Sequence, residues 1–112
     1  MFHYVYILLS KKDNMFYTGY TSNLENRMQD HKKGKVASTK NRRPLLLVYF
    51  ESCLNQQDAT RREKYLKSGN GKIYLNNRIR NFLKESNGVN THVSIKSLAK
   101  IKSPLDVILQ DN

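Results

Sequence analysis

Five side chains whose types suit chemistry on a phosphate ester occur in order along the sequence: Tyr6, Tyr17, Arg27, His31 and Glu63. The planar guanidinium of Arg27 can bind two phosphate oxygens at once and stays charged at any working pH. Glu63 can hold one Mg²⁺, a hard cation that keeps waters and a substrate oxygen as further ligands. Either tyrosine can orient or deprotonate a water if a nearby cation lowers its pKa, which is usually about 10. His31 can relay the proton.

Each of these residues also has a more ordinary interpretation when it is taken singly. Tyrosines on strands are usually half-buried sheet aromatics, and a helix arginine or histidine usually faces solvent. Glu63 stands between Arg62 and Lys64, which is typical of an exposed helix laced with charges. Only the joint occurrence of the five, on elements in a suitable order, favours a catalytic site.

The first two elements are predicted to be strands. Residues Phe2–Leu9 and Met15–Thr21 are rich in aromatic and β-branched types, and the polar residues 11–14 between them are typical of a turn. The short link predicts a hairpin. Gly19, inside the second strand, indicates either a bulge or a place where another group approaches the backbone closely.

A helix is predicted next, because residues 22–25 have the S-x-x-E pattern of a capping box. It should end at Gly34, after two lysines that suit the negative end of a helix dipole. Arg27 and His31 are four residues apart, so they project from a common face beside the apolar stripe.

The remaining elements complete an α+β arrangement. Residues 35–44 form a basic loop, Leu45–Glu51 reads as a buried third strand, and a helix should run from Asn55 to about Ser68. Residues 69–71 contain two glycines and predict a break, after which Lys72–Glu85 should form another helix. The predicted fold class is α/β (α+β), a three-stranded, mainly antiparallel sheet flanked by helices in the order β-β-α-β-α-α.

The charge of the chain is strongly positive. Its 112 residues include 20 Lys and Arg against 9 Asp and Glu, a formal net charge of +11. Residues 1–86 hold most of this excess and are predicted to form one domain, and residues 87–112 a C-terminal appendage with a short helix or partial disorder. Basic surfaces favour nucleic acid as partner, because each neutralised phosphate releases counterions. The predicted nucleic-acid contacts are Gly19, Lys35, Lys40, Arg42, Arg43 and Arg62.

The composition argues against several other classes. No run approaches the ~18 apolar residues that a membrane span requires, and no secretory signal precedes the first strand. The single cysteine, Cys53, cannot form an internal disulfide, so we expect a reducing, cytoplasmic environment. No small-molecule cofactor is predicted.

The ordered set of motifs resembles the GIY-YIG nuclease superfamily, and most closely its small stand-alone bacterial members. The resemblance covers about residues 2–83 and rests on Tyr4-Val5-Tyr6, Tyr17-Thr18-Gly19, Arg27, His31 and Glu63. The chain has Tyr4 where the motif has glycine and Thr18 where it has isoleucine. Neither departure removes a catalytic side chain.

The resemblance implies the roles of individual residues. The expected catalytic set is Tyr6, Tyr17, Arg27, His31, Glu63 and Asn77, with Asn76 as the alternative to Asn77. Glu63 is the expected ligand of a single Mg²⁺ or Mn²⁺. The products of the family carry a 5′-phosphate and a 3′-hydroxyl.

These observations predict a Mg²⁺-dependent endonuclease that acts on DNA, with a role in DNA repair or processing. One alternative is a non-catalytic, basic nucleic-acid-binding module with the same fold. Another is a protein-interaction partner whose C-terminal apolar residues dock elsewhere, namely Val93, Ile95, Leu98 and Ile101. The choice of DNA or RNA and the oligomeric state stay open.

Overall fold

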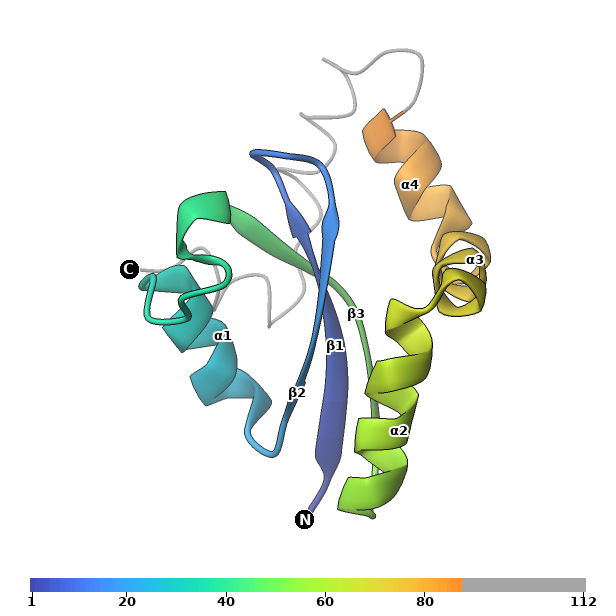
Figure 1. Ribbon diagram of the computed structural model, residues 1–112. Coiled ribbons are helices and arrows are strands. Elements are labelled where there is room, and N and C mark those ends of the chain that lie inside the picture. Colours follow the sequence, from blue (N-terminus) through green and yellow to red (C-terminus); the bar gives the residue numbers. More distant parts are fainter. Residues whose placement is uncertain (88–112) are drawn as a thin grey trace.

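The computed structural model describes residues 1–87, so the predictions for residues 88–112 lie outside the described part (Figure 1). The elements in chain order are β1 (His3–Ser10), β2 (Phe16–Thr21), α1 (Leu24–Lys32), the 3-10 turn η1 (Lys40–Arg42), β3 (Leu45–Cys53), α2 (Gln56–Lys67), α3 (Gly69–Arg78) and α4 (Arg80–Asn87). This order confirms the predicted hairpin, first helix, third strand and following helix.

The sheet has three antiparallel strands in the order β2-β1-β3, with the first strand in the centre. Tyr6 on β1 pairs with Gly19 on one side and with Phe50 on the other. The pairing of β1 with β2 is regular, and a shift occurs only against β3, between Ile7 and Leu8. The predicted fold class is confirmed.

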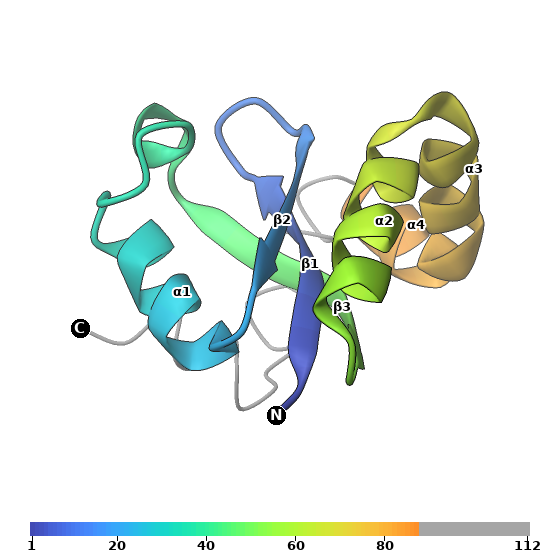
Figure 2. The ribbon, with the colours of Figure 1, turned by 60° about the horizontal axis from the view of Figure 1, so that its bottom comes forward.

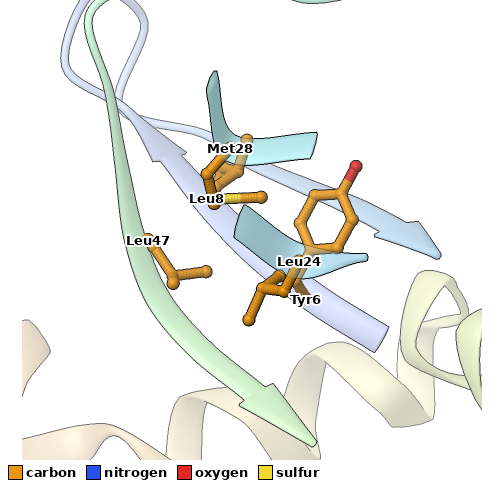
Figure 3. Packing of buried hydrophobic residues seen from close by; sticks show 5 residues of the cluster. All are labelled: Tyr6, Leu8, Leu24, Met28 and Leu47. Carbon is orange, nitrogen blue, oxygen red and sulfur yellow. The ribbon is translucent and has the colours of Figure 1, made fainter. Parts of the chain in front are cut away.

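Helices cover both faces of the sheet, because alternate residues of the central strand point in opposite directions. Tyr6 and Leu8 point toward α1, where they pack with Leu24, Met28 and Leu47 in a buried cluster (Figure 3). The other face of β1 packs against α2 and α3 through a second apolar cluster, whose buried members are Val5, Ile7, Ala59, Leu66 and Leu75. Figure 2 shows α1 on one side of the sheet and α2, α3 and α4 on the other.

The helix starts agree with the sequence patterns to within a residue. The side chain of Asn23 accepts a hydrogen bond from the backbone N–H of Asn26, so Asn23 caps α1 and the capping box predicted at Ser22 is wrong by one position. Asn55 caps α2 as predicted, by accepting from the N–H of Asp58. The longest helix in residues 1–87 has 12 residues, and none there has the length and apolar character needed to cross a membrane.

The glycine pair at residues 69–71 does not break the chain as predicted. Ser68 caps α3 by accepting a hydrogen bond from the N–H of Gly71, so the next helix begins at Gly69. A Cβ atom on Gly71 would collide with the backbone of Tyr65 and Leu66, so the glycine permits a tight corner between α2 and α3. The single helix predicted over 72–85 is also wrong, because the chain leaves helical geometry at Ile79 and forms α3 and α4.

Candidate active site

The ring of Tyr6 lies across the neighbouring strand β2. Only 1% of this residue is exposed, and a Cβ atom on the opposite Gly19 would overlap its hydroxyl end. Glycine at this position therefore makes room for the ring. Of the two interpretations that the sequence left open for Gly19, the structure shows a close approach, and the approaching group is a side chain of the same protein. In Figure 3 the hydroxyl of Tyr6 points away from Leu47 in the apolar cluster.

A buried hydrogen-bond chain starts at the Tyr6 hydroxyl. Its oxygen is 2.8 Å from Nε2 of His31, and Nδ1 of His31 is 2.8 Å from Oγ1 of Thr39. The Thr39 hydroxyl donates to the carbonyl of Val36 at 3.5 Å, which leaves its oxygen to accept from Nδ1–H. This network assigns Nε2 as the acceptor of the Tyr6 proton. His31 and Thr39 are completely buried, so water does not replace either bond.

Tyr17 completes this group, which we call the tyrosine–histidine cluster (Tyr6, Tyr17, His31 and Thr39). The ring of Tyr17 meets the edge of the His31 ring with centroids 5.4 Å apart, and the Tyr6 ring is 6.4 Å away. The Tyr17 hydroxyl accepts a hydrogen bond from Ser38 at 3.4 Å. Two strands, one helix and the following loop thus converge on one small volume.

Burial controls the proton affinities in the cluster. Burial, and then the positive charge of Arg27, lower the pKa of His31 to about 4, against an opposing effect of Asp30. His31 is therefore neutral at physiological pH, as its acceptor role requires. Burial also raises the pKa of Tyr6, as do Tyr17 and Glu63, whereas Arg27 lowers it. The two charged residues predicted for the site thus act on the Tyr6 hydroxyl with opposite signs.

Arg27 and Glu63 stand on different elements, and their charges act on the Tyr6 hydroxyl. Arg27 is half-buried on α1, and no carboxylate of residues 1–87 lies within ion-pair distance of it. Glu63 is on α2, which packs against β1 and β2, and its Oε2 is 3.2 Å from Nζ of Lys67 one helical turn later. The side chain of Glu63 is 22% exposed.

The donor set around Glu63 fits a hard divalent cation held by one carboxylate. Among residues 1–87, no three His, Cys, Asp or Glu side chains gather closely enough to form a metal cage. A single carboxylate is nevertheless sufficient for Mg²⁺, because this ion keeps several waters and takes phosphate oxygens as ligands. Such an ion would compete with Lys67 for Glu63.

Thr39 is held in place by a basic segment, residues 33–44, that is fastened at both ends. Gly34 adopts a left-handed φ of 77°, and the guanidinium of Arg43 lies against it. Arg43 donates to the carbonyls of Lys32 and Lys40, at 3.1 and 2.9 Å, and so ties α1 to η1. Arg42 binds the carboxylate of Asp13 at 2.6 Å, which anchors the segment to the β1–β2 turn.

The residues predicted to contact nucleic acid differ in whether their charge is already paired within the fold. Arg42 and Arg62 are engaged in ion pairs within the fold, with Asp13 and Glu51. Lys40 and Arg43 line a cavity beside the C-terminal end of α1, and Lys35 is exposed. Their contacts with nucleic acid stay predictions.

Asn77 is exposed near the end of α3, where it lines a small hollow with residues 78–82. The contacts of the tyrosine–histidine cluster include neither Asn77 nor its neighbour Asn76. The role assigned to Asn77 by resemblance thus stays a prediction, and so does the choice between the two asparagines.

Sequence reasoning missed three residues that shape the site. Thr39 orients His31, Ser38 bonds Tyr17, and Lys67 pairs with Glu63. The only signal for the first two was the occurrence of two hydroxyl residues at the start of the basic loop. Lys67 could have been found from its spacing, because residues i and i+4 are neighbours on a helix.

Residues 2–78, which include the three-stranded sheet and the tyrosine–histidine cluster, match the family model of the GIY-YIG catalytic domain. The chain belongs to the GIY-YIG nuclease family. It is 51% identical over 67 residues to the UPF0213 protein SH2523 of Staphylococcus haemolyticus, covering 59% of this chain and 80% of that protein. It is 48% identical over 66 residues to the UPF0213 protein CPE1444 of Clostridium perfringens, covering 58% and 70%.

A solved structure is also similar. It is the solution NMR structure of the UPF0213 protein BH0048 from Bacillus halodurans, which is 31% identical to this chain. The match covers 90% of this chain and all of that one, with a TM-score of 0.45.

Proposed function

We propose that this protein is an endonuclease that hydrolyses DNA phosphodiester bonds with the help of one divalent cation, leaving a 5′-phosphate and a 3′-hydroxyl. One observation carries the proposal. The Tyr6 hydroxyl is hydrogen-bonded to a neutral histidine, and its proton affinity responds to both Arg27 and Glu63. Among the family motif residues, His31 contacts this oxygen directly and Arg27 and Glu63 act on it through their charges, and membership of the GIY-YIG family supports the same conclusion.

The hydrogen-bond direction supports a base role for Tyr6. Its proton points to Nε2 of His31, so the proposal requires an attacking water to reach the lone pairs of the buried Tyr6 oxygen when substrate binds. As the water oxygen attacks phosphorus, its proton passes to Tyr6, and the Tyr6 proton passes to His31. The bond to the 3′ oxygen breaks, and that oxygen takes a proton from solvent. Thr39 holds the ring so that Nε2 faces Tyr6 throughout.

Arg27 and Glu63 supply the charge that this step needs. Burial and Tyr17 raise the pKa of Tyr6, the charge of Arg27 opposes that rise, and the Arg27 guanidinium can bind two oxygens of the negative phosphate. Glu63 would hold the Mg²⁺ or Mn²⁺, which supplies positive charge to the phosphate and offsets the pKa-raising effect of the carboxylate. A role in DNA repair or processing and a cytoplasmic location belong to the same proposal.

The test is cleavage of supercoiled plasmid and of a labelled branched DNA, with Mg²⁺ or with EDTA. We expect nicking only with the metal, and a loss of about a hundredfold or more in Glu63→Gln because a charged group that stabilises the transition state is gone. Glu85→Gln, which neutralises an exposed carboxylate on α4, is the control and should cleave like the wild type. Equal cleavage by all three proteins would reject the assignment of Glu63.

One observation favours a second candidate, a nucleic-acid-binding module without catalysis. Nζ of Lys67 is 3.2 Å from one oxygen of Glu63, and its charge compensates the carboxylate without a metal. This candidate predicts binding that weakens steeply with salt and no metal-dependent cleavage. Lys67→Met separates the two candidates, since it should strengthen metal-dependent cleavage in a nuclease and create none in a binding module.

A further inference from the structure

A cavity lies between the β1–β2 turn, the C-terminal end of α1, η1 and the start of β3. It has a volume of about 630 Å³, which is in the range of small-molecule sites. Five cationic side chains line it: Lys11, Lys12, Lys32, Lys40 and Arg43. Among the described residues that form its wall, none is acidic. The cavity shares no residue with the candidate active site.

Lys32 distinguishes this cavity from an ordinary basic surface. Its Nζ is buried and has no hydrogen-bond partner among residues 1–87. Removing an ammonium group from water without a counter-charge is costly, and the carbonyls at the end of α1 offset only part of that cost. The four other cationic side chains of the cavity have the same sign of charge, so they cannot compensate the charge of Lys32. Asp13, the carboxylate of the β1–β2 turn beside the cavity, already binds Arg42.

The cavity is also built to keep its shape. Nζ of Lys12 donates to the carbonyl of Asn41 at 3.0 Å, and Arg43 donates to the carbonyls of Lys32 and Lys40. The backbone N–H of Lys11 donates to the carbonyl of Pro44 at 2.9 Å. These bonds join the β1–β2 turn, the end of α1 and η1 before any ligand arrives. They satisfy neutral carbonyls only, so the positive charge stays uncompensated.

We propose that this cavity binds a phosphomonoester, with the phosphate on Lys32 and its cationic neighbours. A terminal phosphate carries a charge of about −1.5 to −2 near neutral pH, more than the single charge of a backbone phosphodiester, and therefore compensates more of the positive charge around Lys32. The remainder of the wall consists of Asn41 and the apolar residues Pro44, Leu45 and Leu46, and suits the sugar or base attached to that phosphate. The phosphomonoester is either a free nucleotide or the 5′-phosphorylated end of a strand.

Calorimetric titration of the full chain tests this proposal. The probes are inorganic phosphate, 5′-dAMP and deoxyadenosine, all in EDTA, so that the result does not depend on the proposed nuclease activity. We expect 5′-dAMP to bind saturably and deoxyadenosine not to bind. Lys32→Met should weaken 5′-dAMP binding by about tenfold or more, since it removes a charge-assisted bond to phosphate.

Lys33→Met is the matched control, because Lys33 is exposed, lies one residue away and is not part of the cavity wall. It removes the same charge and should change binding by no more than about twofold, as an exposed charge acts only through screened, long-range attraction. The ligand-free Lys32→Met protein should melt at or above the wild-type temperature, because a buried unpaired charge is replaced by an apolar chain of similar length.

The source of the phosphate is read from two oligonucleotides that differ only in a 5′-phosphate or a 5′-hydroxyl. Tighter binding of the phosphorylated strand than of both its partner and 5′-dAMP assigns a strand end. Tight 5′-dAMP binding with no difference between the strands assigns a free nucleotide. The proposal is overturned if no phosphomonoester binds, if deoxyadenosine binds as well as 5′-dAMP, if the two lysine variants behave alike, or if Lys32→Met lowers the melting temperature of the free protein.

Discussion

Two clusters of tyrosines lie on opposite faces of the same sheet, and their hydroxyl groups donate hydrogen bonds to different kinds of acceptor. In the tyrosine–histidine cluster, the hydroxyl of Tyr6 donates to an uncharged imidazole. On the other face is a group that we call the tyrosine–arginine cluster (Tyr49, Glu51, Arg62 and Tyr74). There the hydroxyl of Tyr49 donates to the carboxylate of Glu51 at 3.0 Å.

The tyrosine–arginine cluster has its charges matched internally. Nε of Arg62 is 2.8 Å from Oε1 of Glu51, and its guanidinium lies 4.6 Å above the Tyr74 ring. The hydroxyls of Tyr49 and Tyr74 are 3.3 Å apart. Burial and these hydrogen bonds raise the pKa of Tyr49, and the Glu51 carboxylate raises that of Arg62. The hydrogen bonds and the ion pair join β3 to α2 and α3.

The difference shows how identical residue types serve either stability or chemistry. A phenol that donates to a carboxylate already neutralised by an arginine has nowhere to send its proton. A phenol that donates to a neutral imidazole has an acceptor, and its nearby charges, Arg27 and Glu63, do not pair with one another. We therefore expect changes in one cluster to alter rate and changes in the other to alter stability.

The largest effect should come from removing a single hydroxyl in each cluster. Tyr6→Phe should lower the cleavage rate by about 10²–10⁴-fold, the usual contribution of a general base. Tyr49→Phe should instead lower the free energy of unfolding by about 1–2 kcal/mol, because its hydroxyl bonds are lost. Single-turnover cleavage and urea unfolding of both variants provide the two measurements.

The two variants control for each other, since each removes one oxygen atom from a tyrosine that packs in the sheet. Stability loss in Tyr6→Phe should be small relative to its loss of rate, and the reverse should hold for Tyr49→Phe at a temperature where it is folded. A similar loss of rate in both variants would mean that the clusters are not functionally distinct.

The next effect concerns pH, and it arises from only one of the clusters. The folded protein keeps His31 neutral down to about pH 4, whereas the unfolded chain protonates it at the ordinary pKa of 6.5. The unfolded state therefore binds more protons between these values, and the free energy of unfolding falls as the pH drops through this range. The expected contribution is roughly 3 kcal/mol, complete above pH 6.5.

Urea unfolding at several pH values checks this contribution. His31→Gln should remove most of the decline between pH 6.5 and 4, and His3→Gln, which also removes a histidine, should not. Asp13 does not interfere, because Arg42 lowers its pKa to about 2 and its stabilising effect is lost only below that of His31. An unchanged decline in His31→Gln would show that the imidazole is not held neutral by the fold.

Much of the fold and of the tyrosine–histidine cluster could be predicted from the sequence, for reasons that differ between elements. Strands with β-branched and aromatic runs and a helix capped at Asn55 follow from local patterns, and the order of Tyr6, Tyr17, Arg27, His31 and Glu63 carried the family resemblance. The sequence did not reveal which charged side chains pair with another residue of the same fold. Arg62 was expected at the nucleic acid, but Glu51 holds it from 11 residues away in a register that only the folded sheet defines.

Contacts with residues outside the local pattern also explain why the roles of Gly19 and Gly71 were not predicted. Residues 69–71 looked like a break because glycine is common where helices end, yet Gly71 serves the packing of α3 on the end of α2. Gly19 left two interpretations open because the group that approaches it, Tyr6, is 13 residues earlier in the sequence. Spacing along the chain predicts neighbours within a helix or hairpin, but it does not reveal which side chain crosses a strand.

These two glycines provide the smallest and most selective test of the comparison. In Gly19→Ala the new methyl group meets the hydroxyl end of Tyr6, and in Gly71→Ala it meets the backbone of Tyr65 and Leu66. Moving a catalytic group by about 1 Å can lower the rate by up to ~10²-fold. We therefore expect the Gly19→Ala protein to cleave DNA about 10–100-fold more slowly than the wild type. Gly71→Ala should lose about 1–3 kcal/mol of stability, because backbone cannot move aside as a side chain can.

The readouts that separate the two glycine variants are the cleavage rate per folded molecule and the melting temperature. Gly71→Ala should keep its rate below its melting temperature, since the corner between α2 and α3 lies on the face of the tyrosine–arginine cluster. Gly69→Ala is the control for both, because an added methyl group there meets nothing within 4 Å. If Gly19→Ala kept full activity, Tyr6 would have room to move without consequence, and its hydroxyl could not be the positioned base.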